Sequence, residues 1–236
     1  VYSQYDHQLF LNTVVGPGGE ATVLKLRDPV NGFETNKGLA ITTDGNHRWC
    51  AFNPRIGTKL IVAEGLMNLA CVGANPLALV NCLNFGNPEN PEVMWQLSES
   101  IDGMAEACEE FGIPVVGGNV SLYNESSGEN ISPTPVVGIV GKIEELYRKP
   151  PGFELLEGNR LVLLGPSDIG LGGSLWSALH GFDHGELIDV DFEIHKVLAD
   201  LVISLVFDGT IDGIHDLSAG GLGVALAEMV AKSKFG

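Results

Sequence analysis

Apolar side chains recur every three or four residues between positions 93 and 111, which is the spacing of one face of an α-helix. This spacing predicts a long amphipathic helix, which Gly112 would end. A broader apolar stripe over residues 57–73 predicts a second helix that stops at Gly73. The positions that define the first helix are Val93, Leu97, Ile101, Met104, Cys108 and Phe111.

Short apolar runs between the helical segments predict strands, as expected of a turn-rich α/β chain. A Pro/Gly-containing crossing around residues 148–158 has few apolar anchors, and we place a domain boundary there. The chain then divides into an incoming linker (1–20), an N-terminal domain (21–150) and an incomplete C-terminal α/β domain (151–236). The predicted strands are 21–26, 38–43, 77–83, 113–116, 134–143, 160–165 and 211–216, and further helices are predicted over 191–207 and from 221 onward.

Composition excludes several classes of protein. Of the 236 residues, 44% are hydrophobic and 18% charged, which is too apolar for a disordered chain. Thirteen Lys and Arg against thirty Asp and Glu give a net charge of −17, so nucleic-acid binding is not expected. Neither a membrane-spanning run nor a secretory signal is visible. The four cysteines form no CxxC pair, so we expect no zinc site, no disulfide framework and a cytoplasmic location.

Polar residues follow two of the predicted strands. In ITTDGNHR, Asp44 and Asn46 come at a strand's carboxyl end, where a carboxylate can hold Mg²⁺; the alternative is a turn in which Asp44 caps its own backbone. In VNCLNFGNPENP, three amides suit recognition of a nucleotide base or ribose, although asparagine is also a common turn and helix-capping residue. These amides are Asn81, Asn84 and Asn87.

The segment VVGGNVSLYNE carries a third candidate. Gly117 and Gly118 follow a predicted buried strand and would let backbone N–H groups approach an anion closely. Asn119 and Ser121 then offer a carbonyl oxygen and a hydroxyl on one side of an extended chain. The segment matches neither of the common phosphate-binding patterns, GxxxxGK[ST] and GxGxxG.

A fourth candidate, HDLSAGG, combines His215, Asp216 and Ser218. Adjacent residues of a strand point to opposite faces, so His215 and Asp216 are not expected to form the base and orienting acid of a catalytic triad. We interpret Asp216 as a metal or nucleotide contact, or as a helix cap.

Taken together and in order, five motifs carry a family resemblance: TTDGN, NCLNFGNPENPE, GIPVVGGNVSLYNE, ISPTPVVGIVG and HDLSAGGLGVALAEM. They closely resemble the second half of the synthetase subunit of phosphoribosylformylglycinamidine synthases of the small PurL type, essentially end to end. The resemblance implies an α/β (α+β) fold of the aminoimidazole ribonucleotide synthetase-like superfamily. A barrel-forming N-terminal sheet-and-helix domain would precede a partial α/β C-terminal domain.

The resemblance also implies a reaction of purine biosynthesis. ATP, with Mg²⁺, phosphorylates the amide oxygen of formylglycinamide ribonucleotide, and ammonia from glutamine displaces phosphate to give the amidine. The implied partners are a glutaminase subunit, a small accessory subunit and the missing first half, and self-pairing of an exposed barrel edge is a further expectation. The alternative is a non-catalytic nucleotide-binding or assembly module of the same superfamily.

Site residues carry over from the resemblance one by one. Asn81 stands where the family usually has an ATP-contacting aspartate, and Gly118 matches a nucleotide-contacting glycine. Asn119 matches a Mg²⁺ ligand and Ser121 a substrate contact. Two further residues, Asp44 and Asp216, lie in motifs whose pseudo-symmetric partners face nucleotide and metal. The catalytic histidine belongs to the family's first half, so this chain is expected to hold no catalytic residue and to be inactive alone.

Overall fold

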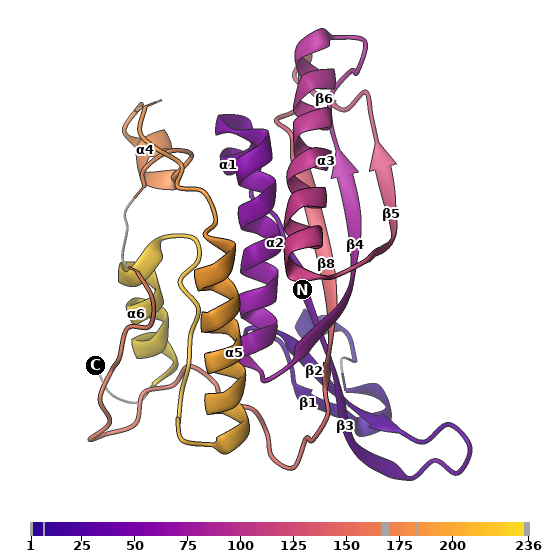
Figure 1. Cartoon of the computed structure of the whole chain (residues 1–236), viewed down its shortest axis with the longest axis vertical. Helices are drawn as coiled ribbons and strands as arrows, with labels where there is room; N and C mark the ends of the chain where they lie inside the picture. Colours follow the sequence, from indigo (N-terminus) through magenta and orange to yellow (C-terminus); the bar gives the residue numbers. More distant parts are fainter. Residues whose placement is uncertain (1, 7, 167–169, 183, 234–236) are drawn as a thin grey trace.

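The computed structural model describes residues 2–6, 8–166, 170–182 and 184–233. A six-stranded sheet in the order β1-β2-β3-β8-β4-β5 forms its larger part (Figure 1). Neighbouring strands are antiparallel, except for the parallel pair of β4 and β5. The strands are β1 (Thr13–Val15), β2 (Thr22–Arg27), β3 (Glu34–Asp44), β4 (Asn75–Asn84), β5 (Val115–Ser121) and β8 (Thr134–Ile143), and a separate hairpin pairs β6 (Glu125–Ser126) with β7 (Glu129–Asn130).

Three helices cover one face of this sheet: α1 (His47–Phe52), α2 (Pro54–Cys71) and α3 (Pro91–Phe111). Asparagine side chains cap all three, because Asn46, Asn53 and Asn90 each accept a hydrogen bond from a backbone N–H of the first turn. Gly112 ends α3 in the left-handed conformation at φ 67°. The predicted amphipathic helix is therefore confirmed as α3, and the predicted helix over 57–73 is the body of α2.

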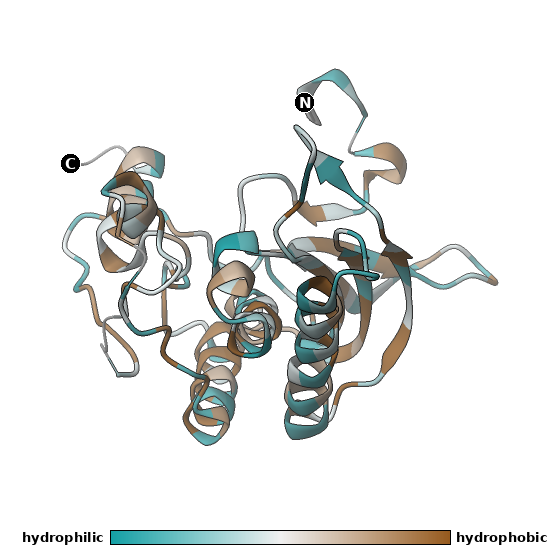
Figure 2. Ribbon diagram, turned by 90° about the horizontal axis from the view of Figure 1, so that it is seen from above, coloured by the Kyte–Doolittle hydropathy of each residue, from teal (hydrophilic) through white to brown (hydrophobic). Residues whose placement is uncertain are grey.

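Among the described residues, no α-helix packs against the opposite face of the sheet, and Figure 2 shows the long helices on one side of it. Leu79, Val137 and Ile139 are fully buried on the helix side, whereas Ile41 and Val80 on the other side are about two-fifths exposed. The sheet stays open in this chain: β1, inside the segment predicted as a linker, is one edge and β5 the other. The family resemblance implies strands that pair across an interface into a barrel, and within the described residues the sheet is open.

The C-terminal part differs from the sequence prediction. Residues 160–165 and 211–216 form no strands, although an isolated bridge joins Gly152 to Gly213. Leu161 and Val162 are exposed, because no neighbouring strand among the described residues pairs with this apolar run. This part contains helices α4 (Leu175–Leu179), α5 (Phe192–Asp208) and α6 (Gly221–Lys232). None of the helices in the described ranges is long and apolar enough to cross a membrane.

Helix α5 packs against α2 and joins the C-terminal part to the N-terminal one. The Lys59 ammonium on α2, which is largely buried, forms ion pairs with Asp189, just before α5, and with Glu106 of α3. His195 of α5 lies beside Phe111, and its Nε2 has no hydrogen-bond partner among the described residues. Burial lowers the pKa of His195 to about 4.

Acid should therefore weaken the docking of α5. A histidine with a folded pKa near 4 and an unfolded value of 6.5 stabilises the fold fully above pH 6.5, and this contribution falls as the pH drops toward 4. The loss amounts to at most about 3 kcal/mol. Urea unfolding at pH 7 and pH 4.5 should show a smaller acid loss for His195→Phe than for the parent. His47→Gln, at an exposed position, should retain the parent's loss, and equal losses in all three proteins would contradict the assignment.

Candidate functional site

Three of the predicted site residues, Asp44, Asn81 and Gly118, lie in one row across the sheet. Asp44 of β3 pairs with Val137 of β8, which pairs with Asn81 of β4, which in turn pairs with Gly118 of β5. Register partners share a face, so this row faces the helices together with buried Val137. Asp44 and Asn81 are two strands apart, or about 10 Å along the row.

Asn81 explains why position 118 is a glycine. The Asn81 amide donates a hydrogen bond to Met104 Sδ of α3 at 3.5 Å, which directs this side chain toward the helix layer. A Cβ on Gly118 would lie 2.0 Å from Asn81 Oδ1 and 2.9 Å from the Asn81 carbonyl oxygen. The glycine is therefore required by the neighbouring strand, and its role as a nucleotide contact stays a proposal.

Asn119 and Ser121 point the other way. They pair with Cys82 and Asn84, so they lie on the face that the helices leave uncovered. Ser121 Oγ contacts Asn124 Oδ1 at 3.2 Å, and Asn124 donates to the Phe85 carbonyl at 3.0 Å. The four residues predicted on β4 and β5 are thus divided between the two faces of the sheet.

The other two amides of the second segment serve the backbone. Asn84 donates to the Thr134 carbonyl at 3.1 Å, and Asn87 accepts from the Glu89 N–H at 2.9 Å. The Asn87 contact agrees with the alternative reading of asparagine as a turn or helix-capping residue, whereas Asn84 links the ends of β4 and β8.

Asp44 belongs to a group of acidic side chains. Its Oδ2 accepts a hydrogen bond from Thr42 at 2.7 Å and its Oδ1 accepts one from the Asn68 amide of α2 at 2.9 Å. Asn46, and not Asp44, caps the following helix. Burial raises the pKa of Asp44, and the charge of Asp216 raises it further. The structure therefore brings two predicted residues, Asp44 and Asp216, close enough for the charge of one to affect the pKa of the other.

Sequence reasoning missed two members of this group, Glu64 and Asn68. They stand four residues apart on α2, which places them on the same side of the helix. Burial first, and then Asp44 and Asp216, raise the pKa of Glu64 to about 7. Two polar residues four positions apart on one side of a helix can indicate a shared polar site. Here the many apolar residues around them made this pattern hard to recognise.

Asp216 also belongs to a second set of charged side chains, which is centred on His215. His215 Nδ1 lies 2.6 Å from Glu20 Oε1 and 3.3 Å from Asp216 Oδ1, and His215 Nε2 lies 3.0 Å from Glu228 Oε2. Burial, followed by Asp216, raises the pKa of Glu20 to about 9. The expectation that His215 and Asp216 point to opposite faces is wrong, because residues 211–216 form no strand.

These groups make up one acidic cluster, defined by Glu20, Asp44, Glu64, Asp216 and Glu228 with the polar residues Asn68 and His215. Within the described part of the chain, no lysine or arginine forms an ion pair with the five carboxylates. Of the five, Asp216 is buried, Glu20, Asp44 and Glu64 are partly buried, and Glu228 is exposed. Carboxylates that are partly or fully buried without a lysine or arginine partner either take up protons or bind a metal cation. Carboxylate and amide oxygens are the ligands that Mg²⁺ prefers, so Asp44, Glu64, Asp216 and Asn68 fit this ion chemically.

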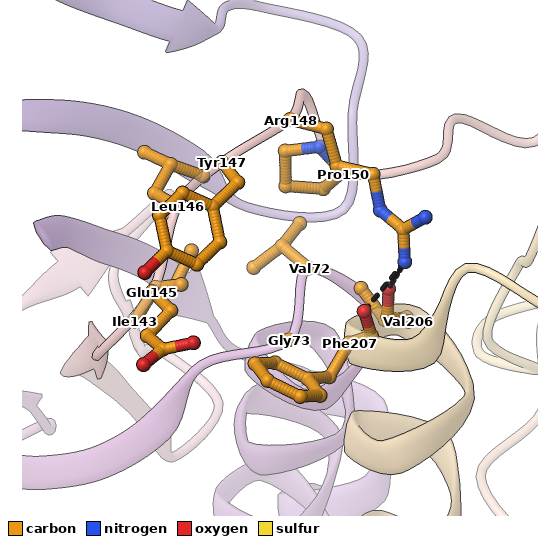
Figure 3. A pocket seen from close by; sticks show the side chains of 10 residues that line it. All are labelled: Val72, Gly73, Ile143, Glu145, Leu146, Tyr147, Arg148, Pro150, Val206 and Phe207. Carbon is orange, nitrogen blue, oxygen red and sulfur yellow. Dashed lines mark hydrogen bonds between the residues drawn. The ribbon is translucent and has the colours of Figure 1, made fainter. Parts of the chain in front are cut away.

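A cavity of about 290 Å³ lies elsewhere, between the C-terminal ends of α2 and α5 (Figure 3). Val72, Ile143 and Phe207 are among its lining residues, and none of the predicted site residues is. Arg148, at its rim, donates hydrogen bonds to the Val206 and Phe207 carbonyls at 2.7 and 2.6 Å. This arginine caps α5, so its charge is used structurally.

The contrast between Gly117 and Gly118 supplies a test of the β4–β5 geometry. Gly118→Ala should lower the free energy of unfolding by about 1–3 kcal/mol, because the added methyl group meets the Asn81 side chain and backbone. At Gly117 the nearest atom to an added Cβ is 4.0 Å away, so Gly117→Ala should cost less than about 1 kcal/mol. Urea denaturation of both variants measures this, and equal losses would contradict the packing described.

Comparison with known proteins gives two matching family models. The N-terminal domain of "AIR synthase related protein" matches residues 18–143, and its C-terminal domain matches residues 157–236. The chain is 45% identical over 228 residues to phosphoribosylformylglycinamidine synthase subunit PurL of Renibacterium salmoninarum, covering 97% of the chain and 29% of that protein. It is 46% identical over 244 residues to the PurL subunit of Aquifex aeolicus, covering 100% of the chain and 33% of that protein. The chain spans about a third of the length of these curated relatives.

Solved structures of Thermotoga maritima proteins are also similar. PurLQS is 38% identical with a TM-score of 0.54, and the match covers 60% of this chain and 23% of that one. PurL complexed with AMPPCP is 37% identical with a TM-score of 0.52, covering 60% and 23%. PurL complexed with FGAR is 37% identical with a TM-score of 0.52, covering 60% and 22%. The family models together match most of the sequence, and the chain belongs to the AIR synthase related protein family.

Proposed function

We propose that this chain is part of a purine-biosynthesis ligase that converts formylglycinamide ribonucleotide, ATP, glutamine and water to formylglycinamidine ribonucleotide, ADP, phosphate and glutamate. Its own contribution would be a Mg²⁺–nucleotide site at the acidic cluster. The convergence of Asp44, Glu64, Asn68 and Asp216 carries this proposal. Its further support is the similarity to PurL subunits and to T. maritima PurL, which has been solved with ATP, ADP and FGAR.

In the proposed reaction, the substrate amide oxygen takes the γ-phosphoryl group of ATP and ADP leaves. Ammonia, released from glutamine on a separate glutaminase subunit, attacks the activated carbon, and phosphate departs with the former amide oxygen. Bound Mg²⁺ would screen the nucleotide phosphates. Asp44, Glu64 and Asp216 would supply the negative charge that holds the ion, and Asn68 would orient Asp44 through its amide.

The remaining predicted contacts divide by face. Asn81 and Gly118 would meet ATP from the helix side, whereas Asn119 would bind Mg²⁺ and Ser121 the substrate from the uncovered side. We propose that the uncovered side is completed by a first half of the enzyme, with a glutaminase and a small accessory subunit as further partners in the cytoplasm. The exposed apolar residues Ile41 and Val80 and the free edge at β5 support a covering surface. In the isolated chain, the same surface would favour self-pairing.

Nucleotide binding can be tested by thermal unfolding. ADP with Mg²⁺ at a hundred times its dissociation constant should stabilise the chain by about 2.7 kcal/mol, which raises the Tm by several degrees. Asp44→Asn and Glu64→Gln should abolish this shift, whereas Glu109→Gln, at an exposed position on α3, should keep it. A shift that persists in both cluster variants would contradict the assignment, as would its absence in the parent chain.

Glu64→Gln also has an expected effect without any ligand. The pKa of Glu64 is raised to about 7, so ionising it above that pH costs stability, by at most about 3 kcal/mol at pH 8. With a chelator at pH 8, the variant should therefore be more stable than the parent, and the difference should shrink as the pH falls toward 4.5. A less stable variant at pH 8 would show that the carboxylate has a stabilising partner.

The isolated chain should make no amidine product. Formylglycinamide ribonucleotide, ATP and an ammonium salt should give no product above the enzyme-free rate, because the catalytic histidine of the proposed enzyme lies in the first half. Nucleotide stabilisation together with this inactivity is the expected combination. Nucleotide-dependent product formation by the chain alone would overturn the proposal, and a full-length enzyme that is equally inactive would favour the non-catalytic module.

A further inference from the structure

His215 is held rigidly at the edge of the acidic cluster. Its ring stacks on Phe153, with ring centres 4.5 Å apart and planes inclined by 17°. Its Nε2 lies 3.0 Å from Glu228 Oε2, an exposed carboxylate of α6. The stacking fixes the plane of the ring, and the Glu228 contact fixes its rotation within that plane.

The other ring nitrogen faces two carboxylates. His215 Nδ1 lies 2.6 Å from Glu20 Oε1 and 3.3 Å from Asp216 Oδ1, and all three side chains are at least nine-tenths buried. Neither His215 Nδ1 nor Glu20 Oε1 has a hydrogen-bond partner in the described part of the chain. When Glu228 accepts the Nε2 proton, the lone pair of Nδ1 points at two carboxylate oxygens, and this arrangement is relieved either by a proton shared between His215 and Glu20 or by a metal cation among the three atoms.

We propose that Glu20, His215 and Asp216 bind a divalent first-row transition metal such as Zn²⁺ or Co²⁺. Their ligand atoms lie within 4.8 Å of one another, a separation that three ligands of one ion can reach with small adjustments. Imidazole nitrogen with two carboxylates suits these ions better than Mg²⁺, which prefers oxygen ligands. The contact between Glu228 and Nε2 matches the carboxylate–histidine–metal arrangement that orients metal-bound histidines in proteins.

The site goes beyond the proposed nucleotide site and shares only Asp216 with it. Asp44, Glu64 and Asn68 take no part, and Glu20 and His215 are not among the residues proposed to hold the nucleotide-bound Mg²⁺. The ligands come from distant segments, because Glu20 precedes β2 whereas His215 and Asp216 precede α6. Lys232 Nζ of α6 already reaches the Gly18 carbonyl at 3.4 Å, so the two segments lie side by side without the ion. A bound metal would add a further link between them.

Metal binding can be measured on the chelator-treated chain without nucleotide. Equilibrium dialysis with Zn²⁺, followed by elemental analysis, should give one bound ion per chain, and Mg²⁺ should bind at least tenfold more weakly. His215→Gln and Glu20→Gln should each weaken Zn²⁺ binding at least tenfold, and Glu228→Gln should weaken it by about 10–100-fold. His180→Gln, at an exposed position beside Trp176, should leave Zn²⁺ binding unchanged.

Two comparisons separate this site from the nucleotide site and from misfolding. Asp44→Asn should lose the nucleotide-induced rise in Tm and change Zn²⁺ affinity less than threefold, whereas His215→Gln should show the reverse. X-ray absorption of the parent chain with Zn²⁺ should show scattering from one imidazole, which does not depend on any variant folding. No bound Zn²⁺ in the parent, no imidazole scattering, or unchanged affinity in both His215→Gln and Glu20→Gln would overturn the proposal.

Discussion

Burial of helix α2 is the constraint on which the rest of the structure depends. The helix packs against the sheet on one side, α3 on a second and α5 on a third. Glycines permit these approaches: a Cβ on Gly57 would lie 2.6 Å from the Trp49 carbonyl carbon, and one on Gly65 would lie 2.8 Å from Asp44 Oδ2. Because the helix is buried on nearly all sides, its few polar residues are held in fixed positions. Glu64 and Asn68 face Asp44 for this reason.

The same burial creates the chemistry of the cluster. A carboxylate on an exposed helix would be hydrated and screened, but Glu20, Asp44 and Glu64 are partly buried, and burial is the first cause of each raised pKa. Lys59 is paired with Asp189 and Arg148 with the end of α5, so neither neutralises these carboxylates. The fold therefore gathers carboxyl groups that take up protons near neutral pH and that a bound cation would hold in their ionised form.

The sequence correctly predicted elements whose hydrophobic pattern reflects a single buried face. The 3.6-residue period of α3 and the alternation of β8 correspond to their single buried faces, and β8 was found at residues 134–143 as predicted. Residues 160–165 were wrongly predicted as a strand, because an apolar run does not reveal whether a partner strand is present. Helix α2 is apolar nearly all round, so the period that would have isolated Glu64 and Asn68 was weak. The contact between His215 and Asp216 depends on a loop whose path the sequence pattern did not predict.

The position of Asn81 in the same row as Asp44 explains why an amide suits this position. The family resemblance implies an aspartate at this position, and an aspartate would stand about 10 Å from Asp44 on the same face. Two unit charges at that distance repel by about 2 kcal/mol at an effective dielectric constant of 20. An amide avoids this repulsion, and it can still donate a hydrogen bond to Met104. The carboxylates of this part of the chain are thus gathered near Asp44, Glu64 and Asp216, while the β4–β5 row presents neutral groups. A site organised in this way would bind the metal-carrying end of a nucleotide at the cluster and would rely on hydrogen bonding, not on charge, along the strands.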